Sequence, residues 1–152
     1  MTPHQSDSTE QRTAEVLILG AASEKLGVEV APRRVDLPGG AYVHVDGVAD
    51  DPRTFIEIYA HLGPLKGGHV HKIAQDILKL VTLHRAYPDA RLALVFADSA
   101  AAARFSGTGW LAEAVKTWDV DVVVIEVPQD VRAAIEAAQL RQVMVNPPKD
   151  PA

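Results

Sequence analysis

Two short segments of this chain alternate between apolar and polar residues, and they flank the turn sequence ADDPRT. Val43 and Val45 alternate with polar neighbours in the first segment, and Ile56 and Ile58 do so in the second. Side chains of a strand point to opposite faces with a period of two, so each segment is predicted to be a strand. The connection suits an antiparallel pair, and we therefore expect a β-hairpin. Its polar side carries Tyr42, His44, Asp46, Glu57, Tyr59 and His61.

The rest of the chain supplies the other elements of a mixed sheet covered by helices. A helix is expected over 10–26, where apolar residues recur at helical spacing before Gly27. Residues 28–35 are expected to form an edge strand, because Pro32 cannot donate a ladder hydrogen bond. Helices are further expected after GPLKGG as far as Arg85, over 109–118 and after Pro128. Strands are further expected over 91–97 and 120–127, with a short final one at 142–145.

The order of these elements predicts the fold class. Strands 91–97 and 120–127 are apolar throughout and are separated by a helix, as in a parallel strand–helix–strand unit buried on both faces. The three earlier strands are linked by short turns and are expected to be antiparallel. The sequence therefore predicts an α/β fold, an α+β mixed sheet with helices on both of its faces.

Length and composition limit the class of protein. A chain of 152 residues favours one domain, predicted to span 9–145 between disordered tails at 1–8 and 146–152. The absence of cysteine excludes disulfides, thiolate metal ligands and cysteine nucleophiles. No apolar run reaches the ~18 residues that a membrane span needs, and the N-terminus lacks a secretory pattern. A cytoplasmic protein is therefore predicted.

The charge distribution gives a mixed indication about nucleic acid. The formal net charge of −5 argues against a basic surface over the whole protein. Residues 61–87, however, contain Lys66, Lys72, Lys79 and Arg85 against the single acid Asp76. A local cationic surface is consistent with a nucleic-acid partner.

Asp46 and Glu57 are the residues that most directly suggest chemistry. They lie on the same side of the predicted hairpin, on neighbouring strands. Two converging carboxylates suit Mg²⁺, which binds through oxygen and keeps several of its waters. The alternative is an ordinary solvated hairpin face, polar outside and apolar inside.

The order helix, three strands, helix and strand, with Asp46 and Glu57 in these places, resembles the PD-(D/E)xK nuclease superfamily. That superfamily has a restriction-endonuclease-like αβββαβ core, and the resemblance covers roughly residues 10–98. It implies metal-dependent hydrolysis of phosphodiester bonds in nucleic acid, with Mg²⁺ or Mn²⁺ as the cofactor. Asp46 and Glu57 would be the metal ligands, and Glu15 on the first helix an accessory catalytic acid. Members of this size commonly act as homodimers.

Two positions depart from the motif of this superfamily. Val45 stands where the motif has a proline, and Tyr59 stands where it has a lysine, two residues after the second acid. Some members carry that lysine on the following helix, and Lys72, one turn into that helix, is our predicted catalytic replacement. On the same helix His69, Lys72, Asp76 and Lys79 form a polar ridge beside the apolar stripe. The residues predicted to contact the substrate are Lys66, His69, Gln75 and Lys79.

Three alternatives remain open at the level of sequence. A zinc site could use His61, His69 and His71 near His44 and Asp46, although residues two apart on a helix point away from each other. The chain could instead be a catalytically inactive interaction module with the nuclease fold. It could also be a small homodimeric α/β scaffold protein. Trp110 and Trp118 are expected to anchor the core or an interface.

Overall fold

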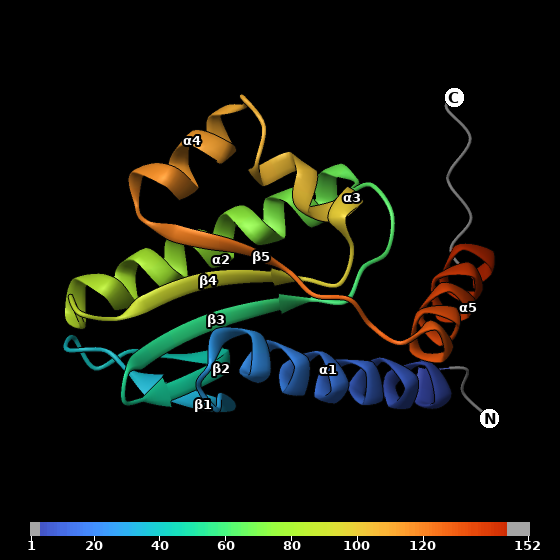
Figure 1. The fold of residues 1–152 in the computed structure, drawn as a ribbon, viewed down its shortest axis with the longest axis horizontal. Coiled ribbons are helices and arrows are strands. Elements are labelled where there is room, and N and C mark those ends of the chain that lie inside the picture. Colours follow the sequence, from blue (N-terminus) through green and yellow to red (C-terminus); the bar gives the residue numbers. More distant parts are fainter. Residues whose placement is uncertain (1–3, 146–152) are drawn as a thin grey trace.

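A five-stranded mixed sheet forms the centre of the protein, with helices on both faces (Figure 1). The computed structural model describes residues 4–145. The elements in chain order are α1 (His4–Leu26), β1 (Ala31–Asp36), β2 (Tyr42–Asp50), β3 (Arg53–Tyr59), α2 (Gly67–Ala86), β4 (Arg91–Phe96), α3 (Ser99–Ala102), η1 (Ala103–Phe105), α4 (Trp110–Thr117), β5 (Val120–Val124) and α5 (Gln129–Val145). This order confirms the expected αβββαβ core, which is followed by helices, a strand and a last helix.

The first three strands form an antiparallel meander at one side of the sheet. β1 pairs with β2 and β2 pairs with β3, both antiparallel, in the spatial order β1-β2-β3-β4-β5. Pro32 lies in β1, which is an edge strand, as its missing N–H requires. Between β1 and β2 the chain reverses at Gly40, whose positive φ of 93° suits glycine. The antiparallel pairing of β2 with β3 confirms the predicted hairpin.

The other half of the sheet is parallel and more deeply buried. β3 pairs with β4 and β4 with β5, both parallel, through crossovers that contain α2 and then α3, η1 and α4. The residues of β4 from Leu92 to Phe96 are at most 2% exposed. A central parallel strand is apolar throughout because helices cover both of its faces.

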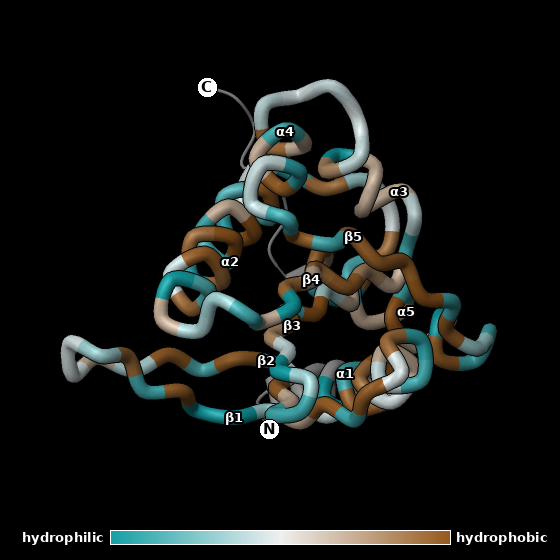
Figure 2. Tube along the Cα trace, turned by 60° about the vertical axis from the view of Figure 1, so that its left-hand side comes forward, coloured by the Kyte–Doolittle hydropathy of each residue, from teal (hydrophilic) through white to brown (hydrophobic). Residues whose placement is uncertain are grey.

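Two hydrophobic clusters hold the helices against the sheet. One lies beneath α2, α3 and α4 and includes Phe55, Leu80, Phe96 and Phe105. The other lies beneath α1 and α5 and includes Ile18, Ile56, Val95 and Ile135. Figure 1 shows the same division, and in Figure 2 brown apolar segments run along β4 and β5 between the two layers. No helix within residues 4–145 has the length and apolar character needed to cross a membrane.

Two boundaries differ from the sequence prediction. Residues 142–145 continue α5 and do not form a strand, because no glycine or proline separates them from the helix that precedes them. Helix α1 begins at His4, earlier than the expected residue 10, directly after Pro3 and with no helix-breaking residue in between. Of the tails expected to be disordered, residues 1–3 and 146–152 lie outside the described part of the chain.

The two tryptophans do not anchor the core. Trp110 is 75% exposed and Trp118 is 52% exposed, at the two ends of α4. The buried positions of α4 are Leu111, Ala112 and Val115. The expectation of a core role is therefore wrong, and a role at an interface stays a prediction.

Candidate functional site

The candidate site lies at Asp46, where the hydrogen-bonded ladder between β2 and β3 ends. Paired residues run from Asp50 with Arg53 to Gly47 with Ile56. Beyond that pair, the carboxylate of Asp46 takes the place of a main-chain carbonyl as acceptor: its Oδ2 accepts a hydrogen bond from the N–H of Ile58 at 2.9 Å. The two strands therefore separate at Asp46, and its side chain is held in the gap.

A β-bulge in β2 aims Asp46 into this gap. Ala31 of β1 pairs with Val48, and Arg33 pairs with Val45. Partners two residues apart in β1 are thus three residues apart in β2, which therefore contains one extra residue. Such a bulge bends the strand and redirects a side chain. Val45 and Val48 consequently both pack beneath α2, which strict alternation would not allow. The predicted alternation holds in β3 and in β2 as far as Asp46, and the bulge breaks it beyond that residue. Because Val45 packs in the same cluster as Tyr59, the prediction that Tyr42 and His44 share a side with Tyr59 is wrong.

Gly47 allows the bulge to lie close against β3. A Cβ atom at this position would stand 2.6 Å from Cγ1 and 2.9 Å from Cδ1 of Ile56, and 3.2 Å from Cβ of Val30. Ile56 is fully buried, so its side chain has little room to move. The absence of a side chain at residue 47 is thus a condition for the position of Asp46.

Glu57 lies beside Asp46 and is almost entirely buried. It is only 3% exposed, on the face of β3 that α2 covers. Burial, and after it the neighbouring Asp46 carboxyl, raise the pKa of Glu57 to about 8, although Lys79 opposes this shift. The alternative of a solvated hairpin face is therefore wrong for Glu57, because α2 packs over it.

Lys79 of α2 provides the cation of this site. Its Nζ donates to Oε1 of Glu57 at 2.7 Å and to the carbonyl of His44 at 3.0 Å. The same atom lies 3.5 Å from Oδ1 of Asp76. Burial would lower the pKa of Lys79, but the hydrogen bond and charge of Glu57 outweigh it, so the pKa is raised and the ammonium stays charged.

Tyr59 occupies the position of the motif's lysine, and it binds Asp76, which also lies against Lys79. Its hydroxyl donates to Oδ2 of Asp76 at 2.9 Å, and both residues are only 7% exposed. Burial, together with the charge of Asp76, raises the pKa of Tyr59 well above its usual range, so the phenol keeps its proton. Tyr59, Asp76, Lys79 and Glu57 therefore form one continuous polar network.

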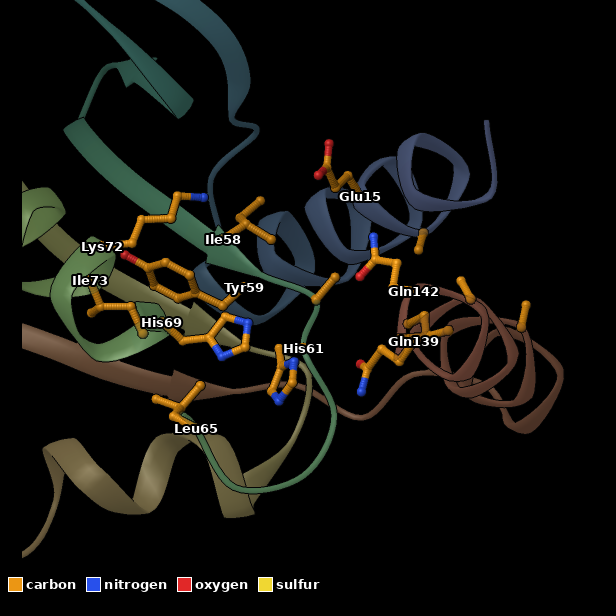
Figure 3. Close-up of a pocket in the computed structure, with 15 residues that line it drawn as sticks. Glu15, Ile58, Tyr59, His61, Leu65, His69, Lys72, Ile73, Gln139 and Gln142 are labelled. Atoms are coloured by element: carbon orange, nitrogen blue, oxygen red, sulfur yellow. The ribbon is translucent and has the colours of Figure 1, made fainter. Parts of the chain in front are cut away.

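A pocket of about 190 Å³ lies next to this network, between β3, α1, α2 and α5. Figure 3 shows His69 and Lys72 of α2 facing Glu15 of α1 and Gln139 and Gln142 of α5, with His61 between them. Burial raises the pKa of Glu15, and the charge of Asp46 raises it further, while Lys72 opposes the shift. Glu15 is thus close enough to Asp46, and Lys72 close enough to Glu15, to interact electrostatically.

The predicted site residues divide into three groups. Asp46, Glu57 and Lys79 come together at the strand separation. Glu15, His69 and Lys72 line the adjoining pocket, so Lys79 rather than Lys72 is the lysine that contacts Glu57. Lys66, at the N-cap of α2, and Gln75, within α2, are both exposed. The main-chain N–H of Lys66 donates to Nδ1 of His69 at 3.4 Å.

Several contributors were not recognised from the sequence. Asp76 lies on the predicted polar ridge, and its spacing of three residues from Lys79 is the signal for their contact on one helix face. Gly47 carried a signal as an isolated glycine within a strand, which is typical of a bulge. Gln139 and Gln142 had no signal, since their place in the pocket depends on how α5 packs.

The donor set at the strand separation fits a hard divalent cation. Asp46 and Glu57 supply adjacent carboxyl oxygens, and Mg²⁺ is commonly held by one or two carboxylates together with waters. Within residues 4–145 no group of three or more His, Asp or Glu side chains converges as a complete metal cage. The zinc alternative therefore lacks a third ligand there: the His61 and His69 rings lie 4.3 Å apart, whereas His71 is exposed.

Comparisons with known proteins give little beyond architecture. Neither a protein-family profile nor a curated protein matches the sequence. Among solved structures, the chain is similar to EndoMS in its apo form, with 19% sequence identity and a TM-score of 0.41. The similarity covers 79% of this chain and 47% of that chain, so this chain spans about half of its length.

Proposed function

We propose that this protein is a Mg²⁺- or Mn²⁺-dependent phosphodiesterase that hydrolyses nucleic acid. The observation that carries the proposal is the meeting of the Asp46 and Glu57 carboxyls where β2 and β3 separate. Two acids side by side, one of them buried, are costly to keep unless a cation or a proton neutralises them. A divalent cation would remove that cost, and this makes the pair a candidate metal site.

In this proposal Asp46 and Glu57 hold the metal. The N–H of Ile58 fixes the orientation of Asp46, since it occupies Oδ2 and leaves the other oxygen to bind. A bound cation supplies charge neutralisation at a phosphoryl oxygen and lowers the pKa of a water that it binds. Glu15, whose pKa responds to Asp46, is the proposed accessory acid.

Lys79 is the proposed catalytic cation, in place of Lys72. Its ammonium is charged and in direct contact with Glu57, so it lies where negative charge would develop beside the metal ligands. Asp76 and Tyr59 are proposed as positioning residues, because the Tyr59 hydroxyl holds Asp76 and Asp76 lies against Lys79. Lys72, Lys66, His69 and Gln75 are proposed to contact the nucleic acid.

The test is cleavage of single-stranded and duplex DNA and of RNA with Mg²⁺ or Mn²⁺. Asp46→Asn and Glu57→Gln should each abolish metal-dependent cleavage, because each removes a carboxylate ligand with little change in size. Asp50→Asn is the matched control, since Asp50 lies at the other end of β2 and pairs with Arg33 at 2.7 Å. An unchanged rate in both site variants would refute the proposal.

A catalytically inactive interaction module is the second candidate. Two observations favour it: Tyr59 replaces the motif's lysine, and Trp110 and Trp118 expose large apolar surfaces on α4. Such a protein would bind nucleic acid or a protein partner, or form a homodimer, without cleavage in any metal. Sedimentation velocity of the wild type and of Trp110→Ser tests the homodimer separately.

A further inference from the structure

The pocket of about 190 Å³ shares a wall with the acid pair. Ile58 joins the two: its N–H holds Asp46, and its side chain lines the pocket. Glu15 and Lys72 lie at the pocket and interact electrostatically with each other. A molecule in the pocket would therefore lie next to any phosphate that reaches the carboxylates.

One side of the pocket presents a pair of flat rings. The centroids of His61 and His69 lie 4.3 Å apart, and the ring planes are inclined by 37°. The main chain engages one nitrogen of each ring, since His61 Nε2 lies 3.3 Å from the carbonyl of Pro64 and His69 Nδ1 accepts from Lys66. The two rings face each other at this separation, and these contacts hold the pair in place, so that a planar group can stack on an outer ring face of the pair.

The rest of the pocket combines an apolar floor with polar groups around it. Leu65, Ile73, Ile135 and Ala138 supply the apolar part. Lys72 offers an ammonium, and the amide of Gln142 offers both a donor and an acceptor. Ring surface, amide and cation together match a heteroaromatic base that carries a phosphate (Figure 3).

We propose that this pocket binds one unpaired nucleoside phosphate, with the base against His61 and His69 and the phosphate near Lys72. The inference rests on the proposed function, because it supplies the substrate contact for the same carboxylates. The pocket is smaller than typical sites for drug-sized ligands, as a site for a single planar group requires. A net charge of −5 also disfavours binding through a broad basic surface, so a local pocket must supply the affinity.

The nucleoside phosphate can reach the pocket in two forms, as an unpaired residue of a nucleic-acid strand or as a free mononucleotide. A base within a duplex is not available until it is unpaired and unstacked, which costs free energy. The pocket therefore favours single-stranded over duplex substrate. Competition experiments separate the strand from the free nucleotide.

The first experiment measures binding of AMP, CMP, GMP and UMP by calorimetry in EDTA, so that no metal contributes. Ribose 5-phosphate and inorganic phosphate should bind at least about tenfold more weakly than the best nucleotide, since neither can stack. His69→Ala should weaken that nucleotide about tenfold. The matched control is His71→Ala, an exposed histidine on the same helix outside the pocket, which should bind as the wild type does.

A second pair of variants keeps the test independent of the His69 contact with Lys66. Ala138→Met adds a side chain inside the pocket, and Ala133→Met adds the same side chain at an exposed position of α5. Only Ala138→Met should reduce nucleotide binding, with both melting temperatures close to that of the wild type. Single-stranded oligothymidylate that displaces the nucleotide indicates a strand source, and failure to displace it indicates a free one.

The outcomes separate this inference from the proposed function. Asp46→Asn should lose cleavage and keep nucleotide binding. If no nucleotide binds, or if Ala138→Met and Ala133→Met behave alike, the pocket inference is wrong even where metal-dependent cleavage is present. If nucleotides bind as expected and no metal supports cleavage, the proposed function fails while the pocket assignment stands.

Discussion

Lys79 Nζ lies 2.7 Å from Glu57 Oε1, and this contact joins the second helix to the most buried acid of the sheet. The Glu57 side chain is 4% exposed and that of Lys79 is 23% exposed. Because Glu57 also adjoins Asp46, which is exposed, three ionisable groups lie together where the buried acid meets the protein surface. Above about pH 8, where Glu57 is ionised, Lys79 offsets one of the two negative charges and leaves the other for a cation.

Substitution of Lys79 by methionine tests this role. Lys79→Met should lower kcat for metal-dependent cleavage about 10²-fold, the magnitude typical for loss of one transition-state donor. Lys72→Met should mainly raise KM, since Lys72 lines the pocket and does not contact Glu57. Steady-state kinetics on a single-stranded substrate measures both. The reverse pattern would identify Lys72 as the catalytic lysine.

Removal of the Tyr59 hydroxyl tests the positioning network. Tyr59→Phe leaves the buried Asp76 carboxylate without its 2.9 Å donor, which should reduce the free energy of unfolding by about 1–3 kcal/mol. It should also lower kcat, because Asp76 would no longer hold Lys79 in place. Urea denaturation and single-turnover cleavage measure the two effects. The matched control, Tyr42→Phe, alters a tyrosine that is 51% exposed and should stay within about 0.5 kcal/mol of the wild type.

Most of the fold was predictable because local patterns agreed with the tertiary arrangement. Alternation identified β3, Pro32 identified the edge strand, and the apolar β4 identified the centre of the sheet. The lengths of the connections distinguished antiparallel from parallel pairs. The end of α5 was missed, since residues 142–145 read as a strand only when they are considered apart from the helix that precedes them.

The site was less predictable because it depends on how elements pack. Lys72 and Lys79 are seven residues apart, nearly two full turns, so they share a helix face and are separated by about 10 Å along the axis. Sequence identifies that face but not the point at which Glu57 meets the helix. Burial of Glu57 also had no local signal, since an alternating strand does not reveal which helix covers its polar side.

Gly47 gives a test of the bulge that orients Asp46. Gly47→Ala places a Cβ 2.6 Å from Ile56 Cγ1 in a fully packed region, and the strain should cost about 1–3 kcal/mol of stability. The shift of β2 should also weaken the increase in melting temperature that the proposed Mg²⁺ site predicts. Gly39→Ala is the matched control, because nothing lies within 4 Å of a Cβ there. Equal stability of the two variants would show that the close approach at Gly47 is not required.

The shared charge of Asp46 and Glu57 predicts a dependence of stability on pH. The pKa of Glu57 is raised from 4.5 to about 8, so the folded protein holds this proton more tightly than the unfolded chain. The associated stability is fully present below about pH 4.5 and is lost as the pH rises towards 8. The slope is at most about 1.4 kcal/mol per pH unit for one proton. Glu57→Gln removes this titration, so its free energy of unfolding should change less than that of the wild type over the same range.

Urea denaturation of the wild type and Glu57→Gln at several pH values between 5 and 8 measures the difference. Burial lowers the pKa of His69, and this makes stability rise with pH, in the opposite direction, but the effect is common to both proteins and cancels in the comparison. At pH 8, Mg²⁺ at 100 times its dissociation constant should stabilise the wild type by about 2.7 kcal/mol, because it replaces the lost proton, and should stabilise Glu57→Gln much less. Parallel pH profiles for the two proteins would mean that Glu57 ionises as freely in the fold as in the unfolded chain, and would remove the electrostatic reason for a cation at this site.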